Sequence, residues 1–413
     1  MTAAHHTCRF CGSPLDAVFA DLGETPLSNS YVTRADIDAG RDPAYPLVVR
    51  VCGTCLLVQA DEVVRHADIF DADYTYFSSY SDSWVEHARR YAQDMCARFS
   101  LDGNSRVIEV ASNDGYLLQH FLKAGVPVLG VEPTAGTAAA AREKGIETRV
   151  AYFGQEMARQ LADEGIRADL TAANNVLAHV PDILDFARGF SEILKPEGVA
   201  TFEFPHVLNL IGEVQFDTIY HEHFSYLSLI TVERIFDEAG LRIYDAEELP
   251  THGGSLRLYA CLQGASHRDR PTVQTIRDKE RAAQLDTLDG YTGFQEKINA
   301  CCRSFRAFLD EAKRAGKRVA AYGAAAKGNT FLNVCGVTSD DILVVADRSH
   351  AKQGKFLPAS HVPIVDPEDL IAARPDYVVI LPWNLAAEIR AQLSELEASG
   401  TRFVVAIPET QIL

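Results

Sequence analysis

The stretch RVIEVASNDGYLLQHFLKAGVPVLGVEP, residues 106–133, constrains the fold of this chain more than any other segment. An apolar run, a polar turn, an amphipathic run and a second apolar run follow one another, which is the pattern of strand, turn, helix and strand. Such alternation is typical of a parallel sheet with crossover helices. It continues through ADLTAANNVLAHV, DILDFARGFSEILKPEG and VATFEFP. The middle of the chain is therefore predicted to be a doubly wound α/β domain.

A second α/β pattern follows in the C-terminal part. RVAAYGAAAKGNTFLNVCG, ILVVADRS, YVVILPW and RFVVAIP indicate another parallel sheet. Residues from about 271 to 316 separate the two patterns and contain many helix formers, so we predict one long helix or a broken pair there. A chain of 413 residues is too long for one compact core and suits two or three domains.

The charge balance argues against a nucleic-acid partner. The formal charge is −18, whereas binding to a phosphate backbone needs a basic face. No uninterrupted apolar run reaches the roughly 18 to 20 residues that span a bilayer, and MTAAHHTCRF lacks the apolar core of a signal peptide. We therefore expect a cytoplasmic enzyme with no membrane partner.

Four of the nine cysteines form two CxxC pairs, CRFC and CGTC. Two such pairs place four thiolates on two tight turns, which is the usual ligand set of a closed, structural zinc site. A redox dithiol or a chance pairing is the alternative. We expect the other five cysteines to be reduced thiols without a catalytic role. The predicted zinc ligands are Cys8, Cys11, Cys52 and Cys55.

The turn in VIEVASNDGYLL, residues 107–118, lies where a nucleotide-binding turn is expected. Ala111 and Asn113 stand where a dinucleotide fingerprint would have glycines, so a pyrophosphate cradle is disfavoured. Glu132 ends the next strand, where an acidic side chain can accept bonds from ribose hydroxyls; a solvated strand end is the alternative. An adenosine cofactor without pyrophosphate, S-adenosylmethionine, fits best. The candidate cofactor-binding residues are Glu109, Ser112, Asn113, Asp114, Gly115, Glu132, Asn174 and Asn175.

The segment FDTIYHEHFSY, residues 216–226, gathers two histidines, a glutamate and two tyrosines. A general base with its partners is one interpretation. A metal site built on His221 and His223 is another, although no HExxH spacing or third clustered ligand supports it. The third is that these histidines only satisfy buried hydrogen bonds.

Taken in order, CxxC…CxxC, EVASNDGYLL, GVEP, ANNVLAHVPD, FDTIYHEHFSY, HGGSLR and AYGAAAKGNTFLN resemble the motifs of the three-domain sugar C-methyltransferases, which act on nucleotide-linked keto-deoxysugars. The resemblance covers essentially the whole chain and is strongest to the deoxysugar C-3 methyltransferases. It implies an α/β protein with a zinc-binding domain at 1–72, a doubly wound class I methyltransferase domain at 73–270, and a Rossmann-like domain at 271–413 that helps to bind the sugar nucleotide. Ala111 departs from the family, which often has glycine there, and YTYFSSYSDS differs in detail.

The resemblance also implies roles in the reaction. His223 resembles the base that removes a proton next to the sugar ketone, which turns that carbon into a nucleophile. Tyr220 and Glu222 would lie beside it, the first as a donor to the oxyanion and the second as a partner of an imidazole or of a sugar group. His179 would be a second polar contact, with a structural role as the alternative. Tyr76 would close the site over the substrate.

In the last domain, AYGAAAKGNTFLN follows a strand and precedes a helix, so its backbone N–H groups are suited to a diphosphate. Lys327, Asn329 and Lys352 are the candidate substrate-binding residues, and Lys355 lies near them. A packing role for the small residues is the alternative.

We therefore predict an S-adenosylmethionine-dependent C-methyltransferase for a 4-keto-deoxysugar linked to a nucleoside diphosphate, with thymidine as the expected nucleoside and C-3 as the expected methylation site. The resemblance favours a monomer. A nicotinamide-dependent sugar-nucleotide oxidoreductase and a non-catalytic zinc-dependent binding module are the alternatives.

Overall fold

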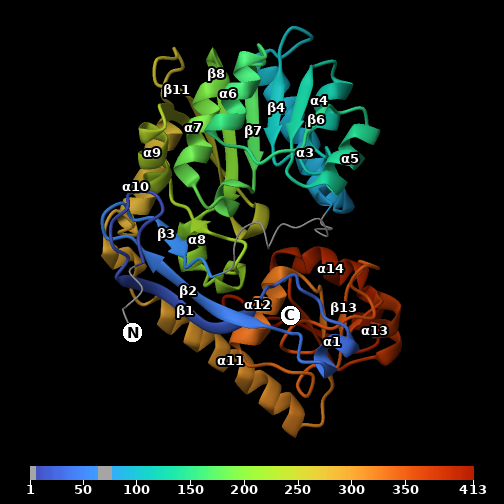
Figure 1. Cartoon of the computed structure of the whole chain (residues 1–413). Helices are drawn as coiled ribbons and strands as arrows, with labels where there is room; N and C mark the ends of the chain where they lie inside the picture. The colour runs from blue at the N-terminus through green and yellow to red at the C-terminus, as the bar shows by residue number, and fades with distance from the viewer. Residues whose placement is uncertain (1–5, 64–76) are drawn as a thin grey trace.

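Three sheets organise the computed structural model, which describes residues 6–63 and 77–413 (Figure 1). A seven-stranded sheet with its helices forms the upper part of the view, a six-stranded sheet lies at the lower right, and a long antiparallel ribbon from the N-terminal region connects them. No helix in the described ranges is long and apolar enough to cross a membrane. The structure confirms the predicted α/β class.

The N-terminal sheet has four antiparallel strands in the order β1-β2-β3-β9. Its last strand comes from far along the chain, because Ser225 and Tyr226 at the end of FDTIYHEHFSY pair with Gln59 and Val58. The elements are β1 (Ala17–Pro26), α1 (Arg34–Asp38), β2 (Ala44–Val51), β3 (Val58–Ala60) and β9 (Ser225–Tyr226).

The seven-stranded sheet has the order β10-β11-β8-β7-β4-β5-β6. Strands β8, β7, β4, β5 and β6 are parallel, while β11 and β10 are antiparallel additions at one edge. The strands are β4 (Val107–Val110), β5 (Val128–Val131), β6 (Thr148–Arg149), β7 (Ala168–Asn174), β8 (Leu194–Pro205), β10 (Leu241–Leu249) and β11 (Ser255–Leu262).

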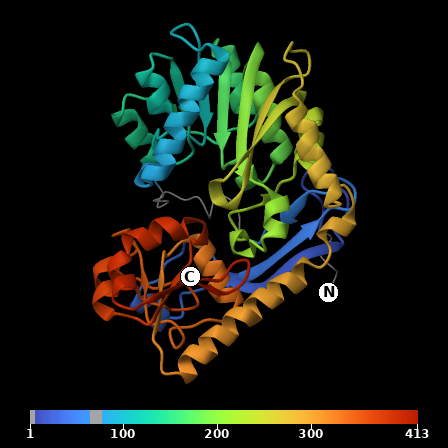
Figure 2. The same cartoon turned by 180° about the vertical axis from the view of Figure 1, so that it is seen from behind.

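Helices cover both faces of this sheet (Figure 2). All four residues of β4 are buried, as expected for a parallel strand that is covered twice. On one face α3 and α4 contribute Tyr91 and Phe121 to the core, and on the other α7 and α9 contribute Phe190 and Phe236. The helices are α3 (Asp82–Phe99), α4 (Leu118–Lys123), α5 (Ala135–Glu143), α6 (Gln155–Asp163), α7 (Ile183–Ile193), α8 (Val207–Gly212) and α9 (Leu229–Glu238).

The C-terminal sheet has the order β14-β13-β12-β15-β16-β17, and only β17 is antiparallel to its neighbour. Its strands are β12 (Val319–Tyr322), β13 (Val345–Ala346), β14 (Ile364–Val365), β15 (Tyr377–Ile380), β16 (Arg402–Val405) and β17 (Gln411–Ile412). Its helices are α12 (Ala326–Val334), α13 (Pro367–Ala373), α14 (Ala386–Gln392) and α15 (Ser394–Ala398).

The helical region between the two parallel sheets is a broken pair. α10 (Pro271–Ala282) ends before a turn in which Gln284 has a φ of 60°, and α11 (Phe294–Arg314) begins after Gly293, whose φ is 76°. Both values lie in the left-handed region, which a right-handed helix cannot contain. The two-helix form of the prediction is therefore confirmed for this segment.

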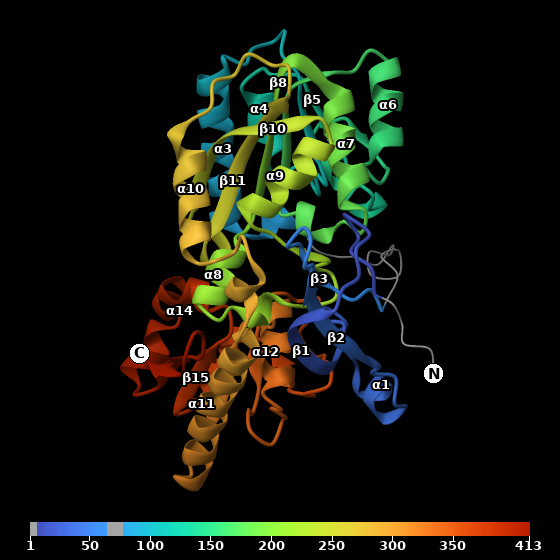
Figure 3. The ribbon, with the colours of Figure 1, turned by 90° about the vertical axis from the view of Figure 1, so that its left-hand side faces the viewer.

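The N-terminal and C-terminal sheets share one hydrophobic core, with α11 beside the long ribbon (Figure 3). Phe19 of β1 stacks on Phe294 of α11 with ring centroids 4.6 Å apart. Phe216 reaches the same core and lies 5.8 Å from the ring of Phe331 on α12. The limits at residues 72 and 270 stay a prediction, but the first and last parts of the chain are packed as one body.

Candidate active site

The four cysteines of the CxxC pairs converge on one point. Their sulfur atoms all lie within 4.8 Å of one another, with Cys8–Cys55 and Cys11–Cys52 separations of 3.5 Å. Tetrahedral zinc with bonds of about 2.3 Å would space its sulfur ligands by about 3.8 Å, so the four atoms fit the metal. Gln59 donates from Nε2 to the Cys8 sulfur at 3.2 Å and orients this ligand.

The zinc turn is tied directly to the segment 216–226. Arg9, between two of the cysteines, donates to the carbonyl oxygens of Ala60 and Phe224, each at 2.7 Å. Its guanidinium also lies 5.2 Å from the centroid of the Phe224 ring. The metal turn therefore holds the residue that follows His223.

The turn after β4 has an unusual backbone. Ala111, Asn113 and Gly115 have φ values of 55°, 48° and 76°. At Gly115 an added Cβ would lie 2.4 Å from Cδ1 of Ile146, so a side chain there would have to displace the end of the Ile146 side chain. Ala111, which departs from the family, adopts the conformation that glycine adopts freely; such strain is common at functional sites.

Two of the three acidic residues in the predicted cofactor site, Glu132 and Asp114, accept hydrogen bonds from nearby donors. Glu132 accepts from the backbone N–H groups of Asn113 and Thr134, both at 2.9 Å, and from Thr137 Oγ1 at 3.1 Å. Asp114 accepts from Lys144 Nζ at 2.9 Å. Both carboxylates lie at the carboxyl edge of the parallel strands, where doubly wound sheets bind ligands.

Several buried polar atoms at this edge have no hydrogen-bond partner among the described residues. Such atoms ordinarily find one, so their gathering fits a polar ligand in the position predicted for S-adenosylmethionine. Burial, with the nearby Glu132 and Asp114, raises the pKa of Glu109 well above its usual range, and only Tyr116 opposes this. The atoms are Ser112 Oγ, Asp114 Oδ1, Asn174 Oδ1 and Asn175 Oδ1, whereas Glu109 interacts with the side chain of Tyr116.

His223 is the candidate base within the segment 216–226. Its Nδ1 is 2.7 Å from the Thr218 carbonyl oxygen, which can only accept, so Nδ1 carries the proton. The ring packs on Tyr220 with centroids 3.9 Å apart and meets His179 edge-on at 4.6 Å. Burial and the neighbouring His179 lower the pKa of His223 well below its usual value. The imidazole is therefore neutral, with its lone pair on Nε2.

Glu222 and His221 point to other partners. The carboxylate of Glu222 is buried and accepts from Ser28 Oγ at 2.9 Å and Asn29 Nδ2 at 3.1 Å, so it does not orient the His223 ring; the Thr218 carbonyl does. His221 donates from Nε2 to the Pro46 carbonyl at 3.2 Å. Among the described residues, the only group of three or more metal-ligating side chains is the cysteine set, so the histidine metal site has no support.

The predicted substrate-binding residues lie around the start of α12. Lys327 donates to Asn384 Oδ1 at 2.9 Å, and Lys352 donates to the Ala324 carbonyl at 2.8 Å. Asn329 is buried and its amide donates to the Ser28 carbonyl, so this group ties two distant segments together. Tyr76 lies outside the described residues. His179 donates from Nδ1 to the Glu222 carbonyl at 2.9 Å.

Sequence reasoning missed a second layer of polar residues. Trp383 follows β15 and donates from Nε1 to Asp217 Oδ2 at 2.8 Å. Burial raises the pKa of Asp217 to about 6. His252, inside HGGSLR, has a φ of 55° and a pKa lowered to about 4, mainly by burial. Asp217, His252 and Trp383 lie in the segments FDTIYHEHFSY, HGGSLR and YVVILPW. The sequence signal for Trp383 was its place just beyond the carboxyl end of a parallel strand, where doubly wound sheets bind ligands.

A cluster of polar and charged side chains surrounds Glu203. Glu203 at the end of β8 is fully buried and accepts from Arg257 at 2.9 Å, from His87 at 3.0 Å and from Thr251 at 2.9 Å. Burial alone would raise the pKa of Glu203, but His87 and Arg257 outweigh it and lower the pKa. Trp84 stacks on His87 at 4.9 Å and meets His252 edge-on at 5.3 Å.

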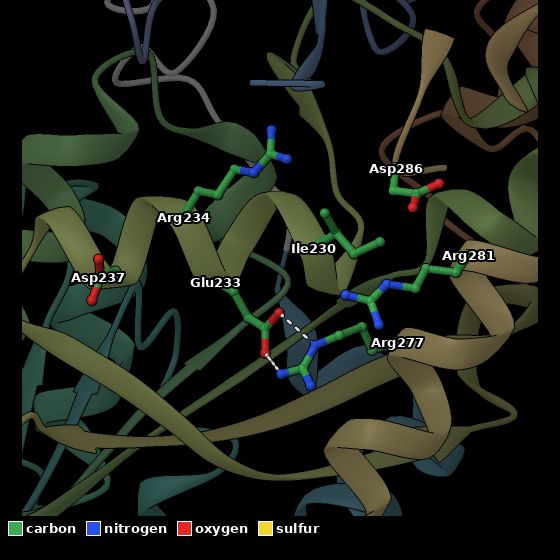
Figure 4. Close-up of a pocket in the computed structure, with 7 residues that line it drawn as sticks. All are labelled: Ile230, Glu233, Arg234, Asp237, Arg277, Arg281 and Asp286. Carbon is green, nitrogen blue, oxygen red and sulfur yellow. Dashed lines mark hydrogen bonds and ion pairs between the residues drawn. The ribbon is translucent and has the colours of Figure 1, made fainter. Parts of the chain in front are cut away.

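A separate hollow of about 520 Å³ lies between α9 and α10 (Figure 4). Arg277 and Glu233 form an ion pair across it. None of the predicted site residues lines it. Its lining consists of Ile230, Glu233, Arg234, Asp237, Arg277, Arg281 and Asp286.

Comparison with known families agrees with this arrangement. Residues 8–70 match the model "Putative zinc binding domain", residues 84–246 match "Methyltransferase domain", and residues 250–408 match "C-methyltransferase C-terminal domain". The chain belongs to the family of C-methyltransferases that combine these three parts. It is an enzyme that methylates with S-adenosylmethionine, and it has a zinc-binding domain in which four cysteines lie close together. The oxidoreductase and binding-module alternatives are not supported.

Individual relatives differ in how much of the chain they match. The C-methyltransferase NovU of Streptomyces niveus is 36% identical over 409 residues, covering 98% of this chain and 96% of NovU. A ubiquinone biosynthesis O-methyltransferase of Azorhizobium caulinodans is 30% identical over 95 residues, 23% of this chain and 38% of that protein. A solved S-adenosylmethionine-dependent methyltransferase from Clostridium acetobutylicum covers 43% of this chain and 92% of its own, with 13% identity and a TM-score of 0.35.

Proposed function

We propose that this C-methyltransferase acts on a 4-keto-deoxysugar linked to a nucleoside diphosphate, thymidine diphosphate in the first instance, and methylates C-3. The observation that carries the proposal is the state of His223. Its Nδ1–H donates to the Thr218 carbonyl, so the neutral ring presents a lone pair on Nε2. Carbon methylation needs a base of this kind, because a C–H carbon is not a nucleophile until a proton next to a ketone is removed.

The residues divide the work as follows. Nε2 of His223 accepts the proton from C-3 of the sugar. The electron pair of the C-3–H bond moves toward the ketone and leaves negative charge on the ketone oxygen. Tyr220, which packs on the imidazole, is proposed to donate to this oxygen. When bound, S-adenosylmethionine supplies an electrophilic methyl group. Glu109, Glu132 and the turn around Gly115 are proposed to hold it.

The sugar contacts proposed for His179, Glu222 and Tyr76 rest on the family resemblance. The nucleotide is proposed to lie along the start of α12, where Lys327, Asn329 and Lys352 gather. The acidic chain as a whole repels an anionic substrate, so local cations at this point are needed to hold a diphosphate.

Mass spectrometry in deuterated water tests the proposal. The protein is incubated with a thymidine-diphosphate 4-keto-deoxysugar, with and without S-adenosylmethionine. Deuterium exchange next to the ketone, together with a methyl mass increase when the cofactor is present, is the expected result. Exchange without methylation would contradict the assigned sugar, and the absence of both signals would contradict the substrate class.

A further inference from the structure

The ammonium group of Lys327 occupies a fixed place over the C-terminal sheet. Lys327 is the second residue of α12, which follows β12, while Trp383 and Asn384 follow the neighbouring parallel strand β15. Its Nζ donates to Asn384 Oδ1 at 2.9 Å and lies 4.9 Å from the centroid of the Trp383 ring. An ammonium held by one hydrogen bond and one aromatic face has donors left for a ligand.

Trp383 connects this ammonium to the proposed base. Its Nε1 donates to Asp217 Oδ2 at 2.8 Å, and the carbonyl of the next residue, Thr218, accepts from His223 Nδ1 at 2.7 Å. On the other side the indole packs against Gly253, where an added Cβ would lie 2.4 Å from Cη2 of the ring. Asp217 Oδ1 is buried and has no hydrogen-bond partner among the described residues. Lysine, tryptophan and base are therefore parts of one contact network.

Burial lowers the pKa of Lys327, and the nearby Asp217 opposes this and favours the charged form. The charge of Lys327 acts on this network and not only on the nucleotide side. Burial has the largest effect on the pKa of His252 and of Asp217, and Lys327 has the second largest. In both residues the charge of Lys327 lowers the pKa. It is the smallest of the causes that lower the pKa of His223, behind burial, His179 and His252. Lys327 is therefore linked to the base by contacts through Trp383 and Asp217 as well as by its charge.

We propose that Lys327 is a catalytic residue whose ammonium stabilises the oxyanion that forms when His223 removes the proton next to the ketone, a role that rests on the proposed function. The C–H electron pair becomes the C=C bond, and the carbonyl π pair moves to the oxygen beside Nζ. The carbonyl re-forms as the carbon takes the methyl group, and no proton leaves the lysine. The charge proposed to hold the diphosphate is then that of Lys352, together with the backbone N–H groups at the start of α12, while Lys327 contacts the sugar of the same substrate.

Exchange kinetics and nucleotide binding distinguish the two roles of Lys327. Lys327→Met and Lys327→Gln remove the charge, Lys327→Arg keeps it, and Asn384→Ala removes only the hydrogen-bond partner. We expect the uncharged variants to lose about 10²–10³-fold in deuterium exchange and in kcat, the cost of removing one oxyanion donor. Their affinity for thymidine diphosphate alone, measured by calorimetry, should change less than about threefold, and Lys327→Arg and Asn384→Ala should lose less activity.

Three outcomes overturn the assignment. A large loss of thymidine-diphosphate affinity with normal exchange at saturating sugar nucleotide would make Lys327 a diphosphate anchor. Unchanged exchange and unchanged affinity in both uncharged variants, with circular dichroism confirming their folds, would leave it without a role. If the unmodified enzyme neither exchanges nor methylates, the proposed function fails first, and the role of Lys327 falls with it.

Discussion

At the scale of single residues, one hydrogen bond determines which nitrogen of His223 is available as a base. The Thr218 carbonyl takes the proton of Nδ1, and a ring packed on Tyr220 and His179 has little freedom to rotate. His221, two residues earlier, is bound to the Pro46 carbonyl and faces the N-terminal sheet. The two histidines of one short motif therefore serve different purposes, which makes them a matched pair for experiment.

His223→Asn should abolish catalysis, because the amide retains a donor for the Thr218 carbonyl and removes the basic nitrogen. We expect kcat and the deuterium exchange rate to fall by about 10²–10⁴-fold, the usual contribution of a general base, while calorimetry finds S-adenosylmethionine affinity unchanged. His221→Gln serves as the control and should keep most of the activity. Equal losses in both variants would remove the assignment of the base.

The pH dependence of kcat/KM follows from the lowered pKa of His223. An imidazole whose folded-state pKa lies below its ordinary value of 6.5 stays neutral as the pH falls through 6.5, so the rate should stay level there and decline only at lower pH. Asp217 takes up its proton near pH 6, and Asp217→Asn separates its contribution from that of His223. A decline centred at 6.5 that persists in Asp217→Asn would contradict the neutral buried base.

At the scale of elements, the turn between β4 and α4 is the proposed cofactor site, and Gly115 within it has both a positive φ and a close neighbour in Ile146. The left-handed conformation alone costs an L-residue about 1–2 kcal/mol. The nearby Ile146 adds a steric clash that the φ value does not include. Gly125, at the end of α4, has a φ of 80° with nothing within 4 Å of an added Cβ.

Gly115→Ala should therefore weaken S-adenosylmethionine binding by about tenfold or more. A displaced turn that loses about 1.4 kcal/mol of binding free energy lowers the affinity tenfold. Gly125→Ala bears the same conformational strain without the clash and should lower only the melting temperature. Calorimetric titration with S-adenosylmethionine and thermal unfolding check both variants. Equal cofactor affinity in the two would show that the turn around Gly115 does not contact the cofactor.

Local signals in the sequence were sufficient for the elements but not for the contacts between them. The strand–turn–helix order of residues 106–133 and the pairing of cysteines in CxxC turns are both set by residues close together in the chain. The structure confirms the predicted strands and helix and brings the four cysteines together. The partners of Glu222 are Ser28 and Asn29, and that of Trp383 is Asp217, each more than 160 positions away. Hydrophobic periodicity contains no information on such pairings, which arise only when the sheets pack.

At the scale of the whole molecule, the zinc turn supports the reaction segment as well as its own sheet. Cys8 precedes Arg9, which donates to the Phe224 carbonyl, and β3 pairs with β9 at the end of the same segment. The metal therefore contributes to the position of His223 from a site built by residues about 200 positions earlier.

Removal of zinc should stop methylation before it stops cofactor binding. A chelator, or Cys55→Ser, should lower the melting temperature by several degrees, because the binding free energy of a structural zinc is folding free energy. S-adenosylmethionine affinity should fall less than the methylation rate, because the buried cysteines pack in one core with Val110 of β4 but none of the four lies in the turn after β4. Cys96→Ser, a thiol outside the zinc set, is the control. Full methylation by protein shown to be metal-free would contradict this coupling.

The stacking of Phe19 on Phe294 has a consequence for biosynthesis. The two rings are separated by 275 positions (294 − 19), so the first hairpin cannot bury its aromatic face until most of the polypeptide has left the ribosome. At about 5–20 residues per second, that interval is roughly 15 to 55 seconds. The N-terminal ribbon is thus translated first but keeps Phe19 exposed for that interval, which makes it prone to aggregation during synthesis.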